Sequence, residues 1–284
     1  MKKQYRIFIL TFFTSFIVLI SIGTIFMMMP DKNDQKDHSS VLSDTYLPKA
    51  QDNLSVLLIG RDRSENNALF FTLLRFDAQH AVLSLAGIPT QTQISVGLQN
   101  DTLNRYFQRG GAIDAVRAVK QALRVSVDRY ALLDENSLIT LADSLQGVEF
   151  NLQSDIINES VNIRKGYQLL DGKRFKDIVL FDTEYQLDLE LAKELIEQRI
   201  TPQLIENADT LFTKITGSME TNISFYDFES RKPALRHWIQ NYSSRTEIFT
   251  FDGQYSDEDT FLLSEDSVTR YRQTIYHLAG TESE

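Results

Sequence analysis

The chain has 284 residues, no cysteine and a formal net charge of −10 at pH 7. This charge disfavours nucleic-acid binding, and tight docking onto anionic lipid or wall polymer would need a local basic patch or a bridging cation. Disulfides and cysteine-ligated zinc or redox sites are excluded.

The N-terminal segment Ile7–Met29 is a run of 23 residues without a charge. At about 1.5 Å per residue, a helix of this length spans about 35 Å, which is enough to cross a bilayer. Lys2, Lys3 and Arg6 precede the run, and basic residues mark the cytoplasmic side of a membrane helix. We therefore predict a cytoplasmic N-terminus at residues 1–6, a transmembrane signal anchor at residues 7–29, and an extracytoplasmic domain held at the cell membrane.

A cleaved signal peptide is the alternative interpretation of this segment. The apolar run is longer than the core of a signal peptide, and the following sequence MMMPDKN offers no small-residue cleavage site. Residues 30–52 are polar and rich in charge, which is typical of a flexible tether. Residues 53–280 are long enough to form one domain with a large core.

The start of this domain has the pattern of buried strands. Val56–Gly60 is a short apolar run closed by glycine, and Phe70–Phe76 and Ala81–Ala86 flank the turn-like sequence DAQH. These three segments are predicted as successive strands. Gly110 and Gly111 then introduce an amphipathic helix.

Strand-like and helix-like segments alternate through the rest of the chain. Further strands are predicted at Tyr130–Leu133, Val148–Leu152 and Glu247–Phe251, and helices at Ser137–Leu145, Leu187–Ile200, Leu204–Ile215, Asp227–Tyr242 and Ser264–Leu278. Pro233 predicts a kink or a break in its helix. The fold class is therefore α/β, with a mixed central sheet sandwiched between helical layers.

Six motifs occur together in the order and spacing of one family. LLIGRD contains Gly60 and Asp62, IPTQT follows the third predicted strand, and TLN is followed by GG. The pattern continues in VSVDRYALLDENSLITLADSLQGVEFNL, GYQLLDGKRFKDIVLF and TNISFYDFESRKPAL. From Asn53 to Leu278 the chain resembles the LytR–CpsA–Psr family of cell-envelope proteins.

The resemblance implies transfer of a phosphoglycosyl polymer from a polyprenyl pyrophosphate carrier onto peptidoglycan. Such chemistry needs arginines for the pyrophosphate and carboxylates for a divalent ion. The chain departs from the family at the positions that would carry these charges, which are Asn67, Leu69, Thr90, Gln91, Thr102, Leu180, Asp182 and the arginine-free stretch Leu187–Leu195. We expect that the fold is kept and the transfer activity is lost, because missing charge-stabilising groups leave the transition state unstabilised.

Five residues near the carboxyl end of the first strand form a candidate ligand pocket: Arg61, Asp62, Thr90, Asn104 and Arg105. Ligands of α/β sheets bind at such strand ends, so these residues could be the remnant of an anion site. Asp62 and Asn104 match family positions, whereas the two arginines do not. The plainer interpretation is a set of solvated loop charges in which Asp62 caps a turn. No catalytic residue is assigned.

No metal site and no cofactor are predicted, and Mg²⁺ would enter only with an active enzyme. The chain has four histidines, which show no ligand spacing: His38, His80, His237 and His277. It also has an acidic group at a loop and helix start: Asp182, Glu184, Asp188 and Glu190. Carboxylates are favoured at a helix start without any metal.

Three functional hypotheses remain. The first is a non-catalytic, membrane-anchored family member that binds a lipid-linked precursor or a partner protein of the envelope. The second is an active phosphotransferase with relocated charges, drawn from Arg61, Arg63, Arg75 and Arg105. The third is an acidic interaction domain that docks a basic envelope protein without any ligand. Converging arginines would favour the second hypothesis, an open apolar cavity would favour lipid binding, and a filled cavity would favour the third.

Overall fold

The computed structural model describes residues 46–278, apart from residues 63–65, 158–160, 182–186 and 257–258. Across these described ranges, no helix is both long enough and apolar enough to span a membrane. The predicted anchor Ile7–Met29 lies outside the described residues, as does most of the predicted tether.

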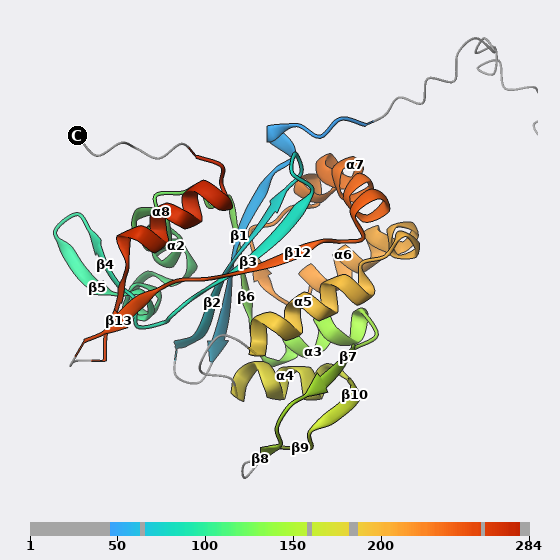
Figure 1. Ribbon diagram of the computed structural model, residues 1–284, viewed down its shortest axis with the longest axis horizontal. Helices are drawn as coiled ribbons and strands as arrows, with labels where there is room; N and C mark the ends of the chain where they lie inside the picture. The colour runs from blue at the N-terminus through green and yellow to red at the C-terminus, as the bar shows by residue number, and fades with distance from the viewer. Residues whose placement is uncertain (1–45, 63–65, 158–160, 182–186, 257–258, 279–284) are drawn as a thin grey trace, which may run out of the picture. The chain divides into compact units, whose positions relative to one another are not determined.

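A six-stranded mixed sheet forms the centre of the domain, in the order β11–β6–β1–β2–β3–β12 (Figure 1). The strands are β1 (Leu54–Asp62), β2 (Asn67–Asp77), β3 (Val82–Ile88), β6 (Arg129–Leu133), β11 (Glu220–Thr221) and β12 (Thr246–Thr250). β1, β2 and β3 form an antiparallel meander, while β6 pairs in parallel with β1 and β12 in parallel with β3. The last residues of β1, β3, β6 and β12 therefore lie at the same end of the sheet, which we call the carboxyl end.

Helices cover both faces of this sheet (Figure 1). They are α2 (Leu103–Leu123), α3 (Glu135–Ser144), α4 (Gly172–Phe181), α5 (Leu187–Arg199), α6 (Ala208–Thr216), α7 (Phe225–Tyr242) and α8 (Glu265–Thr274). Successive side chains of β1 point to opposite faces. Leu57 and Ile59 pack in a cluster with α2 and α8, whereas Leu58 packs against a cluster built from α3, α4 and α5. The predicted α/β class with a mixed central sheet is confirmed.

Short hairpins and 3₁₀ turns complete the domain. The hairpins are β4 (Gln93–Val96) with β5 (Gln99–Thr102), β7 (Val148–Leu152) with β10 (Gly166–Leu170), β8 (Ile156–Ile157) with β9 (Asn162–Ile163), and β13 (Gly253–Tyr255) with β14 (Phe261–Leu263). The 3₁₀ turns are η1 (Ala50–Asp52) and η2 (Pro202–Asn207).

Packing of the domain begins at Tyr46, before the predicted domain start at residue 53. The hydroxyl of Tyr46 donates to Asp52 Oδ2 at 2.6 Å, and the Asp52 carboxylate is buried. Arg231 of α7 donates to the backbone carbonyls of Gln51 and Asn53. The end of the polar segment is thus bonded to the domain.

Two helices differ from their predicted outlines. α2 starts at Leu103, before the glycine pair, because Thr102 caps it by accepting a hydrogen bond from the Arg105 amide. Gly110 and Gly111 have non-helical torsions, with a positive φ of 64° at Gly111, so a kink there separates a first helical stretch from the one that was predicted to follow the glycine pair. α7 starts at Phe225, two residues before its predicted start, and Pro233 does not break it into two helices.

Candidate functional site

The structure gathers three of the five predicted pocket residues at the carboxyl end of the sheet. Asp62 is the last residue of β1 and lies opposite Asn67 in the β1–β2 register. Asn104, in the first turn of α2, accepts a hydrogen bond from the Ala68 amide at 3.0 Å through its side-chain oxygen. The backbone N–H of Asn104 donates a hydrogen bond to the backbone carbonyl of Thr90 at 2.9 Å. Asn104 therefore holds the start of β2 and the loop after β3 together.

The amino terminus of α2 faces this end of the sheet, and such helix ends can bind anions through free backbone amides. Here the first-turn amides already have partners. Leu103 donates to Thr92 O at 2.8 Å, Asn104 to Thr90 O, and Arg105 to the Thr102 hydroxyl at 3.4 Å. A phosphate would have to displace these bonds before it could use the helix end.

Arg61 and Arg105, the other two predicted pocket residues, bind separate carboxylates. Arg61 Nη1 lies 3.0 Å from Glu220 Oε2, across the sheet on β11. Arg105 lies 3.7 Å from Asp101 and its side chain is 70% exposed, while Arg109 binds the same aspartate at 3.1 Å. The two predicted arginines thus do not converge. Within the described chain, Arg61 Nε is buried and has no hydrogen-bond partner.

Arg75, proposed above as a relocated charge, lies at the wrong end of the sheet for that role. In the β1–β2 register it is opposite Ser55, six residues before Arg61 and so about 20 Å away at about 3.3 Å per residue. It is buried and donates to Ile275 O at 3.0 Å, to Ser55 Oγ at 3.2 Å and to Asp77 Oδ2 at 3.4 Å. Arg75 therefore anchors the chain after α8 to the sheet. Arg63 is not among the described residues.

A cation that the sequence did not single out lies near this end of the sheet. Lys176 of α4 contacts Asp177 at 2.5 Å and Glu135, at the start of α3, at 3.7 Å. Burial lowers the pKa of Lys176, but the two carboxylates outweigh it, so the pKa is raised above its ordinary value. The lysine is charged, and its charge is neutralised locally.

Three residues at the family's charged positions have structural roles in this chain. Thr102 is the N-cap of α2, and Asn67 accepts a hydrogen bond from the Gln108 side chain. Leu180 packs against the cluster formed by α3, α4 and α5, and Leu69 is 39% exposed.

Of the predicted acidic group, Asp182 and Glu184 lie outside the described residues, Asp188 is buried and Glu190 is exposed.

A small apolar cavity lies between the sheet and helices α3, α4 and α5. Its volume is about 70 Å³, and its lining includes Leu58, Phe70, Leu133, Leu141 and Phe175. A water molecule takes about 30 Å³ of liquid, and ligand pockets usually hold about 300–1,000 Å³, so this space is nearly filled.

Phe70 contributes to this filling because its ring lies against Gly60 of β1. A Cβ atom added at Gly60 would lie 2.2 Å from Phe70 Cε1. The glycine of the LLIGRD motif therefore makes room for an aromatic ring.

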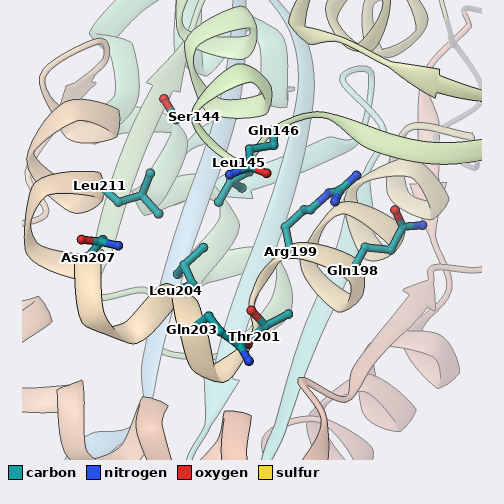
Figure 2. A pocket seen from close by; sticks show the side chains of 10 residues that line it. All are labelled: Ser144, Leu145, Gln146, Gln198, Arg199, Thr201, Gln203, Leu204, Asn207 and Leu211. Atoms are coloured by element: carbon teal, nitrogen blue, oxygen red, sulfur yellow. The ribbon is translucent and has the colours of Figure 1, made fainter.

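A larger cavity of about 520 Å³ opens between the end of α3, the end of α5, η2 and α6 (Figure 2). Leu204 and Leu211 face it from η2 and α6 and give it an apolar side. On the other side, Arg199 Nε donates to Gly147 O at 2.6 Å and Gln198 Nε2 donates to Glu149 O at 2.8 Å. No sequence pattern indicates this cavity, because its lining comes from separate helices that only the fold brings together.

Comparison with known proteins agrees with the observed fold. The family model described as the LytR_cpsA_psr family matches residues 19–275. The polyisoprenyl-teichoic acid–peptidoglycan teichoic acid transferase TagU of Enterococcus faecalis is 22% identical over 255 residues, which cover 81% of this chain and 83% of that protein.

Solved structures share the architecture at low sequence identity. A structure from Eubacterium siraeum has a TM-score of 0.74 at 18% identity and covers 86% of this chain and 99% of its own. The LytR-CPS2A-psr family protein YwtF (TagT), solved with bound octaprenyl pyrophosphate lipid, has a TM-score of 0.61 at 17% identity and covers 86% of this chain and 97% of its own. Because the family model spans nearly the whole described domain, and the motifs from Gly60 to Gly111 lie where the fold needs them, this chain belongs to the LytR-CpsA-Psr family.

Proposed function

We propose that this chain is a non-catalytic member of the LytR-CpsA-Psr family that acts at the cell envelope by binding a partner rather than by transferring a polymer. On this proposal the segment Ile7–Met29 anchors it in the membrane, and the domain works outside the cell. The observation that carries the proposal is the arrangement of charged and apolar side chains at the carboxyl end of the sheet. Arg61, Arg105 and Lys176 each lie beside a different carboxylate there and do not converge, and Leu69 and Leu180 are apolar.

The size of the missing interaction energy between cations and phosphate oxygens supports the loss of polymer transfer activity. A cation about 4 Å from a phosphate oxygen contributes about 4 kcal/mol at an effective dielectric constant of about 20. A pyrophosphate leaving group needs several such contacts at once, because charge develops on more than one oxygen. Two leucines and a threonine at those positions supply none of them.

The small size of the apolar cavity between the sheet and helices α3, α4 and α5 favours a protein partner over a stored lipid. The apolar space beneath the sheet measures about 70 Å³, which is too small for a long isoprenoid chain. The formal charge of −10 includes the basic residues Lys2, Lys3 and Arg6, so the remainder of the chain is more acidic still. An acidic domain is steered towards a basic partner, which makes a basic envelope protein the favoured class.

Lipid binding is the second candidate, and the larger cavity favours it. The 520 Å³ space has leucines on one side, and α3 and α5 line both this cavity and the smaller one. The solved relative YwtF carries octaprenyl pyrophosphate. Mass spectrometry of lipids that copurify with the full chain tests this candidate: a long-chain isoprenoid found in stoichiometric amount would replace the protein partner as the leading ligand.

The main experiment measures phosphate release from a polyprenyl pyrophosphate by the purified full chain in non-ionic detergent, with and without Mg²⁺. We expect no turnover, while the TagU relative serves as the active control. Mg²⁺-dependent turnover that disappears in Arg61→Ala would overturn the proposal and support relocated charges. Arg117→Ala, which removes an exposed arginine paired with Asp114 on α2, is the matched control for that variant.

A further inference from the structure

The turn between β2 and β3 brings together two histidines and a buried carboxylate. Asp77 ends β2, and its Oδ1 accepts hydrogen bonds from the amides of Gln79 and His80, each at 3.1 Å. These bonds fix the carboxylate, which is almost fully buried. His277 follows α8, close to the end of the described chain, and its ring lies beside that of His80.

The three side chains have the distances of a metal-binding group. His80 Nδ1 lies 3.1 Å from Asp77 Oδ1, and His277 Nε2 lies 3.7 Å from Asp77 Oδ2. One nitrogen of each histidine and a carboxylate oxygen all lie within 4.8 Å of one another. Ligands of a tetrahedral zinc ion lie about 3.3 Å apart, because metal–ligand bonds are about 2.0–2.1 Å. The donor atoms lie within 4.8 Å rather than at this spacing, so the two imidazoles would have to turn to reach one ion.

The chemistry of the donors selects the type of ion. Two imidazoles favour zinc, nickel, copper or cobalt, whereas Mg²⁺ prefers oxygen ligands in an octahedral arrangement. The side chains of His80 and His277 are 52% and 40% exposed, so water can reach the remaining coordination positions. The guanidinium of Arg75, 3.4 Å from Asp77 Oδ2, partly offsets the carboxylate charge and limits the affinity.

We propose that Asp77, His80 and His277 bind one divalent transition-metal ion, and Zn²⁺ is the ion used to test the site. The ion joins the β2–β3 turn to the segment after α8, which Arg75 already holds through the Ile275 carbonyl. Because His277 is far from Asp77 in sequence, the ion closes a long loop and stabilises the docking of α8. This site lies at the opposite end of the sheet from the candidate ligand pocket and does not depend on its function.

The test is a calorimetric titration of the full chain, purified in detergent without a histidine tag, with ZnCl₂ and separately with MgCl₂. We expect one Zn²⁺ per chain, no saturable Mg²⁺ binding, and a Tm higher by about 5–10 °C at a hundredfold excess over Kd. Co²⁺ should give the visible absorption of a four-coordinate site.

Single variants at the histidines identify the ligands. His80→Asn and His277→Asn should each weaken Zn²⁺ binding by at least tenfold, and asparagine tolerates the positive φ of 51° at His277. His237→Asn, which removes an imidazole outside the cluster, is the matched control and should bind as the natural chain does. Absence of saturable Zn²⁺ binding would overturn the proposal, as would unchanged affinity in both variants or an equal loss in His237→Asn.

Discussion

Arg129 binds the carboxylate of Asp227 through two nitrogen atoms and so joins the start of β6 to the first turn of α7. The Nε–Oδ2 distance is 2.8 Å and the Nη2–Oδ1 distance is 2.7 Å. The same carboxylate accepts hydrogen bonds from the amide and the hydroxyl of Ser224, which caps α7. Burial raises the pKa of Asp227, but the bonds from Arg129 and Ser224 outweigh it and lower the pKa to about 2.

This lowered pKa predicts an acid-sensitive contribution to stability. A carboxyl group whose pKa is lower in the folded state stabilises the fold above its unfolded pKa of 3.8, and this contribution is lost as the pH falls through the folded value of about 2. The free energy of unfolding should therefore fall by about 2 kcal/mol between about pH 5 and pH 1.5 through this group alone. Urea unfolding at a series of pH values measures it.

Asp227→Asn supplies the comparison, because it keeps the shape of the side chain and removes its titration. The stability difference between the natural chain and the variant should shrink as the pH falls through this window. If the two chains lose stability in parallel from pH 5 downwards, Asp227 contributes nothing to acid sensitivity.

The contact between Gly60 and Phe70 predicts a coupled pair. Gly60→Ala should lower the free energy of unfolding by about 1–3 kcal/mol, because the new Cβ would lie 2.2 Å from Phe70 Cε1. Phe70→Ala leaves a cavity and should cost about 3 kcal/mol or more. With the ring absent, Gly60→Ala should cost at least about 1 kcal/mol less than in the natural chain.

Leu69→Ala is the control for this cycle, since Leu69 points to the other side of β2 from Phe70 and is partly exposed. Its effect should add to that of Gly60→Ala within about 0.5 kcal/mol. A Gly60→Ala cost that is equal with and without the Phe70 ring would show that the contact does not exclude a methyl group.

The sequence predicted the strands of the sheet well because their information is local. Val56–Gly60 and Phe70–Phe76 are apolar runs, and each lies inside an observed strand. The helix α4 was not predicted, although Asp171 is a start signal whose side chain accepts a hydrogen bond from the Arg174 amide at 2.9 Å. The need for Gly172 is tertiary: a Cβ there would lie 2.5 Å from the Ile139 carbonyl oxygen of α3.

The candidate site also has a part that the sequence predicts and a part that depends on tertiary contacts. Five residues were placed at one end of the sheet from the end of the first strand and from the family resemblance, and the structure brings three of them together: Asp62, Thr90 and Asn104. Arg75 could have been assigned to the opposite end from the register of an antiparallel meander, since it lies near the end of β2. The pairing of His80 with His277 has no sequence signal, because it depends on where the last helix docks.

Loss of several charges predicts that no single replacement restores activity. Thr90→Arg should show no phosphate release from a polyprenyl pyrophosphate with Mg²⁺, because groups that stabilise one transition state act as a unit. The new guanidinium would still lack partners at Leu69 and Leu180. The assay uses the purified full chain, and the fold of the variant is checked by its thermal unfolding. Mg²⁺-dependent turnover in Thr90→Arg would show that the site has lost one group rather than its whole charge set.

The uncharged segment Ile7–Met29 predicts a domain outside the cell. Basic residues at positions 2, 3 and 6 favour a cytoplasmic N-terminus, so the chain after the segment should cross the membrane. Protease added to intact cells after digestion of the wall should remove the domain, while a cytoplasmic marker protein stays whole. Replacing Lys2, Lys3 and Arg6 with glutamate should reduce the cleaved fraction, because it removes the orienting charge. Cleavage that occurs only after the membrane is opened would place the domain inside the cell and contradict both the anchor and the envelope role.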